Sequence, residues 1–197
     1  MNTASDLKKK DKNIKIIYGL EAYFVNDLVP AVKGQSQKTF EDEFIAFDIE
    51  TTGLSPSKER ITEIGAVKVK NGEITDRFDI FVNPQIHIPK KITQLTGITD
   101  EMVKDAPLEK EAIKAFYDFC GEDAVLVAHN ADFDTSFIRV AAKRNNMEFN
   151  YTYIDTVPMC RSMLKGIKNC KLDTVAKYLK LDPFNQHRAC DDAAVLG

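Results

Sequence analysis

The sequence of 197 residues contains no tryptophan, only three histidines and only four cysteines. Histidine is the side chain that most readily titrates near neutral pH, so few residues can serve as a general base. The cysteines include no C-x-x-C pair, which disfavours a zinc site or a disulfide framework. We therefore expect a cytoplasmic protein with four reduced thiols, at Cys120, Cys160, Cys170 and Cys190.

Long apolar runs and an excess of positive charge are also missing. No stretch approaches the roughly 20 apolar residues that cross a bilayer, and no apolar signal-peptide core follows the lysines near the N-terminus. We expect no membrane partner. The formal net charge of −3 argues against an electrostatic clamp for long duplex nucleic acid. A protein that holds only the end of a strand needs less basic surface, so nucleic acid remains a possible partner.

The most informative stretch is FIAFDIETTGL, residues 44–54. Its apolar start predicts a central strand buried on both faces. Because side chains alternate along a strand, Asp48 and Glu50 should project from the same side. No lysine or arginine occurs between Phe44 and Ser57, so a bound divalent metal ion would best relieve the repulsion of the two acids. Two solvated acids where the strand ends are the alternative, which the apolar approach and the Thr-Thr-Gly exit disfavour.

The remaining pattern predicts an α/β fold. Further strands are expected at 61–70, 74–82, 124–128 and 153–155, the first two joined by an Asn-Gly turn. Helices are expected at 92–95, 105–120, 131–145, 157–164, 171–179 and from 188 onward. A strand meander followed by alternating helices and strands predicts a mixed five-stranded sheet flanked by helices on both faces.

The first 42 residues resemble a separate piece. A lysine-rich lead-in precedes one or two strands at 15–25, and a polar connector follows at 32–39. An isolated strand pair is marginal in water, so this segment needs a partner. We therefore place a domain boundary between residues 1–42 and 43–197.

Helical spacing selects two more acids. In the helix at 131–145, Asp134 lies on the buried stripe, whereas Asp132 lies on the wet side. In the last helix, Asp192 shares a face with the apolar residues and Asp191 does not. A buried acid is costly unless it is paired or bound to a metal. Asp134 and Asp192 therefore join Asp48 and Glu50 as candidate metal ligands.

The three histidines differ in how well they fit a functional role. His187 stands five residues before Asp192 and is the best candidate for a general base. His129 ends an apolar strand, where it could meet a ligand or simply bond to the backbone, and both possibilities stay open. His87 lies in a predicted loop and should be a surface residue.

The segments FDIETTGL, HNADFD and HRACDDA resemble, in order, the motifs of the DEDD superfamily of 3′–5′ exonucleases, in the subgroup whose last motif carries histidine. The resemblance spans about Phe44 to Leu196. The stretches GAVKVKNGEITDRF, LTGITDEMVKDAP and LVAHNADFD are most similar to the proofreading exonuclease domain of PolC-type DNA polymerase III. That domain is inserted in a PHP domain, so residues 1–42 would be a PHP remnant and linker. Glu21 would match one PHP metal ligand, and Gly197 would cut the last helix short.

The resemblance implies a ribonuclease H-like sheet and removal of nucleoside monophosphates from DNA 3′ ends. Asp48 would bridge two divalent cations, Mg²⁺ or Mn²⁺, with Glu50 and Asp192 at one and Asp134 at the other. His187 would accept the proton of the attacking water.

The implied partners are a single-stranded or frayed DNA 3′ end and the remainder of a polymerase chain. Residues expected to contact the DNA are Thr51, Thr52, Gly53, Leu54, His129, Asn130 and Phe133. For Leu54 and Phe133, plain core packing is the alternative. An RNA-trimming exonuclease of the same superfamily and an inert structural fragment remain the alternative functions.

Overall fold

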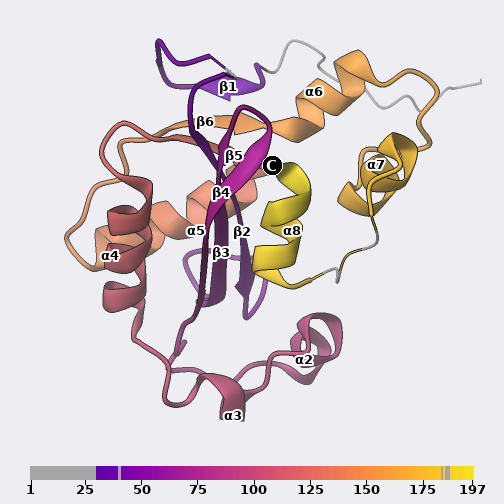
Figure 1. The fold of residues 1–197 in the computed structure, drawn as a ribbon. Helices are drawn as coiled ribbons and strands as arrows, with labels where there is room; N and C mark the ends of the chain where they lie inside the picture. Colours follow the sequence, from indigo (N-terminus) through magenta and orange to yellow (C-terminus); the bar gives the residue numbers. More distant parts are fainter. Residues whose placement is uncertain (1–29, 40, 183, 185–186) are drawn as a thin grey trace, which may run out of the picture.

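Six strands form one mixed sheet within the part of the chain that the computed structural model describes, which is residues 30–39, 41–182, 184 and 187–197. The strand order is β1-β6-β5-β2-β3-β4 (Figure 1). The strands are β1 (Val32–Lys33), β2 (Phe44–Thr51), β3 (Ile61–Lys70), β4 (Glu73–Phe81), β5 (Val125–Ala128) and β6 (Thr152–Asp155). The predicted mixed sheet is confirmed. The strands expected at 15–25, and Glu21, lie outside the described residues.

The predicted number of five strands was wrong by one. The additional strand is β1, which lies in the expected connector and pairs antiparallel with β6, Val32 opposite Ile154 and Lys33 opposite Tyr153. A two-residue strand is too short to leave a pattern in the sequence.

Apart from α3, which was not predicted, the described helices lie close to their predicted positions. They are α2 (Lys90–Thr96), α3 (Asp100–Val103), α4 (Glu109–Cys120), α5 (Ala131–Arg144), α6 (Thr156–Met163), α7 (Leu172–Leu179) and α8 (Ala189–Leu196). The helix expected from residue 105 begins at Glu109 instead. The segment before it forms α3 and a turn, and the carbonyl of Pro107 accepts a bond from Asn83 N. None of the described helices is long and apolar enough to cross a membrane.

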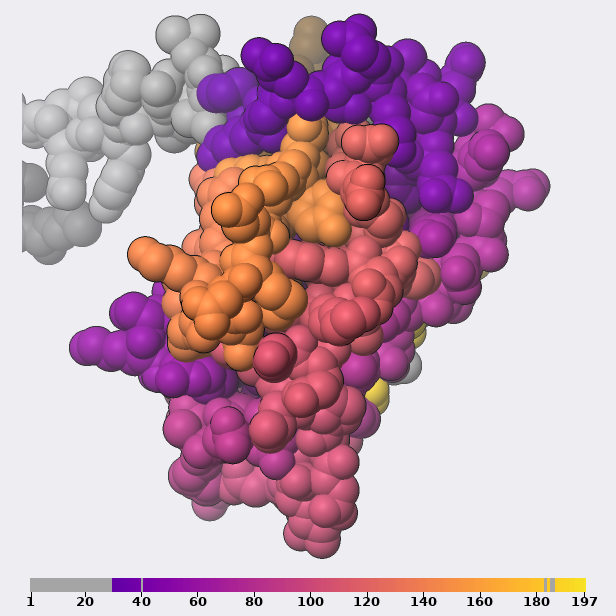
Figure 2. All heavy atoms as spheres, turned by 90° about the vertical axis from the view of Figure 1, so that its left-hand side faces the viewer, coloured from indigo at the N-terminus to yellow at the C-terminus, as the bar shows by residue number. Residues whose placement is uncertain are grey.

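The central strand β2 places one row of side chains on each face of the sheet. It pairs antiparallel with β3 and parallel with β5. On one face, Phe47 packs with Phe116 of α4 and Phe137 of α5 in the main core. Figure 2 views this side of the molecule, where the rose surface of α4 and α5 is prominent and α8, in yellow, is almost hidden. On the other face, Ala46 and Val67 pack against Leu196 of α8.

A glycine allows α8 to cross the sheet closely. A Cβ built on Gly65 of β3 would lie 2.1 Å from both the carbonyl carbon of Ala189 and the nitrogen of Cys190. Gly65 is also the register partner of Asp48. The first turn of α8 is therefore held directly over the middle of β2 and β3.

The prediction of four reduced thiols was wrong for two of them. Cys160 and Cys170 form a disulfide with a Cα–Cα distance of 6.1 Å, whereas Cys120 and Cys190 are free. The pair was not predictable from a short motif because its ten-residue spacing matches none. The fold brings the two together by returning the chain from α6 to the start of α7.

Several bonds tie residues 30–39 to β6 and α5. The amide of Asp155 donates to the carbonyl of Ala31 (2.8 Å), and the hydroxyl of Thr152 donates to the carbonyl of Gln35 (2.7 Å). Lys33 forms an ion pair with Asp132 at 2.5 Å. The boundary between residues 42 and 43 stays a prediction, since this segment packs against the domain that follows it.

Candidate active site

Four acids from three elements interact at the middle of the sheet. Asp48 and Glu50 come from β2, Asp134 from the first turn of α5 and Asp192 from the first turn of α8. Burial raises the pKa of Asp48 well above its usual value, and the charges of Asp134, Asp192 and Glu50 raise it further. Asp134 and Asp192 are buried, with exposed fractions of 2% and 7%. The structure therefore brings together the four acids that the sequence selected.

The topology explains this convergence. Because β5 runs parallel to β2, the helix that follows β5 begins beside the end of β2 that carries Glu50. Asp134 falls on the buried side of α5, while Asp132 is exposed and binds Lys33. On the opposite face of the sheet, α8 crosses β3 closely at Gly65, and this crossing brings Asp192 near Asp48.

The other three acids also hold their protons unusually well. Burial, followed by the charges of Asp192 and Glu63, raises the pKa of Glu50 to about 8. Burial also raises the pKa of Asp192 to about 6, although the bond from the His187 amide opposes the change. Burial raises the pKa of Asp134 well above its usual value, against two backbone hydrogen bonds, and the charge of Glu50 adds to the rise. Without positive charge, full ionisation of this cluster is costly.

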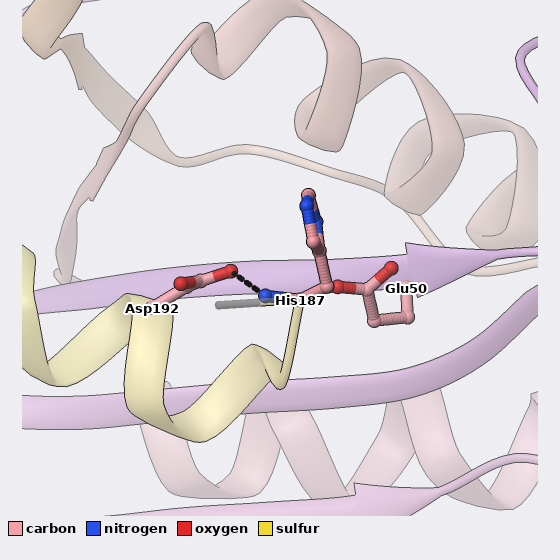
Figure 3. Close-up of side chains that lie close together, drawn as sticks. All are labelled: Glu50, His187 and Asp192. Carbon is pink, nitrogen blue, oxygen red and sulfur yellow. Dashed lines mark hydrogen bonds between the residues drawn. The ribbon is translucent and has the colours of Figure 1, made fainter. Parts of the chain in front are cut away.

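Glu50, His187 and Asp192 form a compact group. One potential ligand atom from each lies within 4.8 Å of the others. The amide of His187 donates to Oδ2 of Asp192 at 3.0 Å, and Figure 3 shows the imidazole standing away from that bond. His187 is exposed and has a φ of 63°. Its ring is therefore accessible beside the two carboxyls, as a residue that acts on a substrate must be.

The donor set fits a divalent cation. Oδ1 of Asp192 is buried and has no hydrogen-bond partner in the described residues. An unpaired buried carboxylate oxygen is costly, and hard oxygen ligands suit Mg²⁺ and Mn²⁺. A bound cation would coordinate this oxygen and reduce the repulsion among the acids.

The threonines expected to contact DNA bond within the β2–β3 loop. Thr51 donates its hydroxyl to the carbonyl of Gly53 (2.6 Å). Thr52 donates to Glu59 (2.7 Å) and accepts from the amide of Arg60 (3.0 Å). The hydroxyls thus shape the loop, and any contact from Thr51 or Thr52 to a nucleotide would come from the backbone.

Leu54 and Phe133 differ from each other. Leu54 is 84% exposed, so core packing does not explain it. Phe133 is half-buried and its ring lies 5.1 Å from that of Phe137, so core packing accounts for part of its environment. Their contacts with DNA stay predictions.

His129 bonds within the protein through both ring nitrogens. Nε2 lies 2.7 Å from the carbonyl oxygen of Cys170 and Nδ1 lies 2.8 Å from the hydroxyl of Thr156. A carbonyl only accepts, so Nε2 carries the proton, and burial lowers the pKa of the ring. These bonds favour the backbone-bonding alternative. The neighbouring Asn130 has a φ of 67° and donates its amide to Asp155 (3.0 Å).

Sequence reasoning missed Glu63. This residue of β3 is fully buried and is the register partner of Glu50. Its Oε1 accepts from Arg188 Nη2 at 2.9 Å, and its Oε2 accepts from the amide of Ala189 at 3.0 Å. Glu63 therefore holds the start of α8, the helix that carries Asp192. An acid inside the apolar run of β3 was the available signal.

Comparison with known proteins supplies the family. The model of the exonuclease family RNase_T matches residues 45–196. The chain belongs to this exonuclease family. The motif resemblance to 3′–5′ exonucleases had pointed to the same group.

Relatives of this exonuclease chain include much longer proteins. It is 49% identical over 184 residues to the PolC-type DNA polymerase III of Caldanaerobacter subterraneus and 41% identical over 186 residues to that of Bacillus subtilis. Both alignments cover 93% of this chain and only 13% of the relative. The resemblance to PolC-type sequences is confirmed, and the chain spans about an eighth of the length of these relatives.

Solved structures of exonucleases share the fold. Exonuclease X in complex with 5′ overhanging duplex DNA is 30% identical, with a TM-score of 0.61 and coverage of 78% of this chain and 84% of that chain. Escherichia coli Exonuclease I in complex with a dA16 oligonucleotide is 16% identical, with a TM-score of 0.68 and coverage of 78% and 39%. The second likeness concerns the fold alone.

Proposed function

We propose that this exonuclease is metal-dependent and releases nucleoside monophosphates from the 3′ end of DNA. The observation that carries the proposal is the convergence of Asp48, Glu50, Asp134 and Asp192 at one place, with His187 exposed beside them. Membership in an exonuclease family supports hydrolysis of a phosphodiester at a strand end.

The four carboxyls would hold one or two divalent cations. Asp48 lies within the field of the other three acids, so it would hold the cations together with Glu50, Asp192 and Asp134. When bound, the cations would supply positive charge to the attacking water and to the leaving 3′ oxygen. His187 would accept the proton of that water from its exposed position.

The rim of the site would receive the terminal nucleotide. The exposed side chain of Leu54 offers an apolar surface on which a terminal base can pack. Backbone groups of the Thr51–Gly53 loop would meet the sugar. Contacts of this kind do not depend on base identity, as the removal of any mismatched terminus requires.

We further propose that the chain is the proofreading part of a PolC-type DNA polymerase III, joined to the rest of that polymerase through a PHP remnant in residues 1–42. Its relatives carry that polymerase name. A mismatched end frays more readily than a paired one, so selectivity can come from the cost of unpairing.

The test is nucleotide release from a 5′-labelled single-stranded DNA in the presence of Mg²⁺ or Mn²⁺. A ladder that shortens by single nucleotides, stops on addition of EDTA and requires a free 3′ hydroxyl is expected. An RNA oligonucleotide of the same sequence is the matched substrate. Preference for RNA would favour the RNA-trimming alternative, and no release from either with intact folding would favour a structural fragment.

A further inference from the structure

The segment from Arg161 to Asp182 carries a concentration of positive charge. It contains six cations and two acids, although the whole chain has a net charge of −3. All six cations are exposed. They are Arg161, Lys165, Lys168, Lys171, Lys177 and Lys180.

These cations have few protein partners. Among the ion pairs of the described residues, only Lys177 of this segment takes part, with Asp173 at 3.7 Å. Elsewhere, lysines such as Lys33 and Lys114 contact an acid directly. A solvated charged face is the ordinary explanation for exposed lysines, but such a face usually mixes both signs.

The segment is joined to the elements that carry two of the acids, α5 and α8. His129, which precedes the helix that carries Asp134, bonds to the carbonyl oxygen of Cys170. The Cys160–Cys170 disulfide holds the same turn to α6. Side chains of α6, α7 and α8 line an apolar hollow of about 300 Å³. Figure 1 shows these three helices on the same side of the molecule. The cations are therefore carried by a segment that contacts the start of α5 through His129 and the C-terminal end of α8.

The surface also offers an aromatic side chain. Tyr178 is 47% exposed, and its hydroxyl donates to the carbonyl of Lys165 (3.0 Å). This hydrogen bond holds the ring of Tyr178 in place, and the exposed part of the ring can stack with a nucleotide base. Cations interleaved with an exposed ring are typical of surfaces that follow a single strand.

We propose that the segment Arg161–Asp182 binds the sugar-phosphate backbone of the single strand whose 3′ end occupies the acidic site. The inference rests on the proposed function, since it needs a strand end at that site. Four acids repel an approaching phosphate chain, and adjacent cations offset this repulsion where the strand passes. Contacts to phosphates are independent of sequence.

The experiment compares two triple variants. One removes Lys165, Lys168 and Lys171 by substitution with glutamine. The control replaces three exposed lysines of α4 and α5, on the opposite face of the sheet: Lys110, Lys114 and Lys143. Both have the same net charge. Each is assayed without reductant, to keep the disulfide, and its folding is checked by thermal melting.

Two substrates separate strand binding from hydrolysis. Single-stranded DNA would span both the site and the cationic segment, whereas the p-nitrophenyl ester of thymidine 5′-monophosphate would reach the site alone. For the first variant we expect KM for DNA to rise about tenfold or more over that of the control at low salt. The loss of kcat/KM should be at least about tenfold greater on DNA than on the ester.

Salt dependence gives a second readout. Each phosphate contact to a single strand contributes about 0.7 to the slope of log affinity against log salt, so the slope should become shallower by about 2. Fluorescence anisotropy of labelled DNA in Ca²⁺ measures this slope without turnover. A variant with the KM, Kd and salt slope of the control would overturn the inference and point to another partner. Failure of the wild type to hydrolyse either substrate would instead refute the proposed function, and the anisotropy would still decide the inference.

Discussion

Glu50 and Glu63 are register partners on β2 and β3, and both are buried acids, yet their main interaction partners differ. Glu63 is compensated by Arg188 and by the amide of Ala189. Glu50 has acids as its main charged neighbours, and its pKa rises to about 8. The comparison shows how one sheet holds a paired structural acid beside a cluster of acids that repel one another.

Removal of one acid from the cluster should have the largest effect. We expect Asp48→Asn to reduce nucleotide release below detection, because Asp48 adjoins all three other acids. The metal-free fold should be equally or more stable, since one repelling charge is gone. Activity and thermal melting measure the two effects. Asp105→Asn, at an exposed position, is the control, and retained activity in Asp48→Asn would contradict the assignment.

Removal of the proposed general base, His187, should have a smaller effect. We expect His187→Ala to slow turnover by roughly 10²–10⁴, the range for loss of a general base, while the rise in Tm on addition of metal persists. The matched control is His87→Ala, an exposed histidine paired with Asp100. Unchanged turnover at neutral pH would remove His187 from the mechanism.

Removal of Glu63 should destabilise the fold, whereas removal of Asp48 should not. We expect Glu63→Ala to destabilise the fold by about 3 kcal/mol, because Arg188 and the amide of Ala189 lose their acceptor. Urea denaturation measures the cost. The double variant Glu63→Leu with Arg188→Leu should recover much of it, because both charges are then absent. A cost of the single change below about 1 kcal/mol would mean that the pair does not hold α8.

The stability of the metal-free protein should depend on pH because of the acids in the cluster. The pKa of Glu50 rises from 4.5 to about 8 and that of Asp192 from 3.8 to about 6, so between these values the folded state binds more protons than the unfolded state. Stability should therefore fall as the pH rises, by roughly 1.4 kcal/mol per pH unit for each such proton. Denaturation in EDTA at several pH values tests this, and saturating Mn²⁺ should weaken the trend.

Only one side of this contrast, the acidic cluster, was visible before the structure. Alternation in β2 and helical spacing in α5 and α8 are local patterns, and they were enough to select the four acids. The strands and helices were predictable for the same reason. The burial of Asp134 and the exposure of Asp132 follow from helix geometry alone.

The remainder depends on contacts between distant segments. Glu63 meets Arg188 across more than a hundred residues, so no window of sequence reveals that pair. The disulfide and the pairing of β1 with β6 likewise arise from the path of the chain. His129 could not be assigned from its position at the end of β5, because its bonding partner Cys170 lies in a turn that the pattern does not place.

Gly65 has no side chain to take part in catalysis, yet the arrangement of the site is sensitive to substitution at this position. The backbone of α8 passes where a methyl group on this residue would be, so any replacement would lift the helix and its carboxyl away from β2. A genetic screen for mutators should therefore recover changes at Gly65 alongside those at the acids. The spacing between Asp192 and the acids of β2 therefore depends on the absence of a Cβ atom at Gly65.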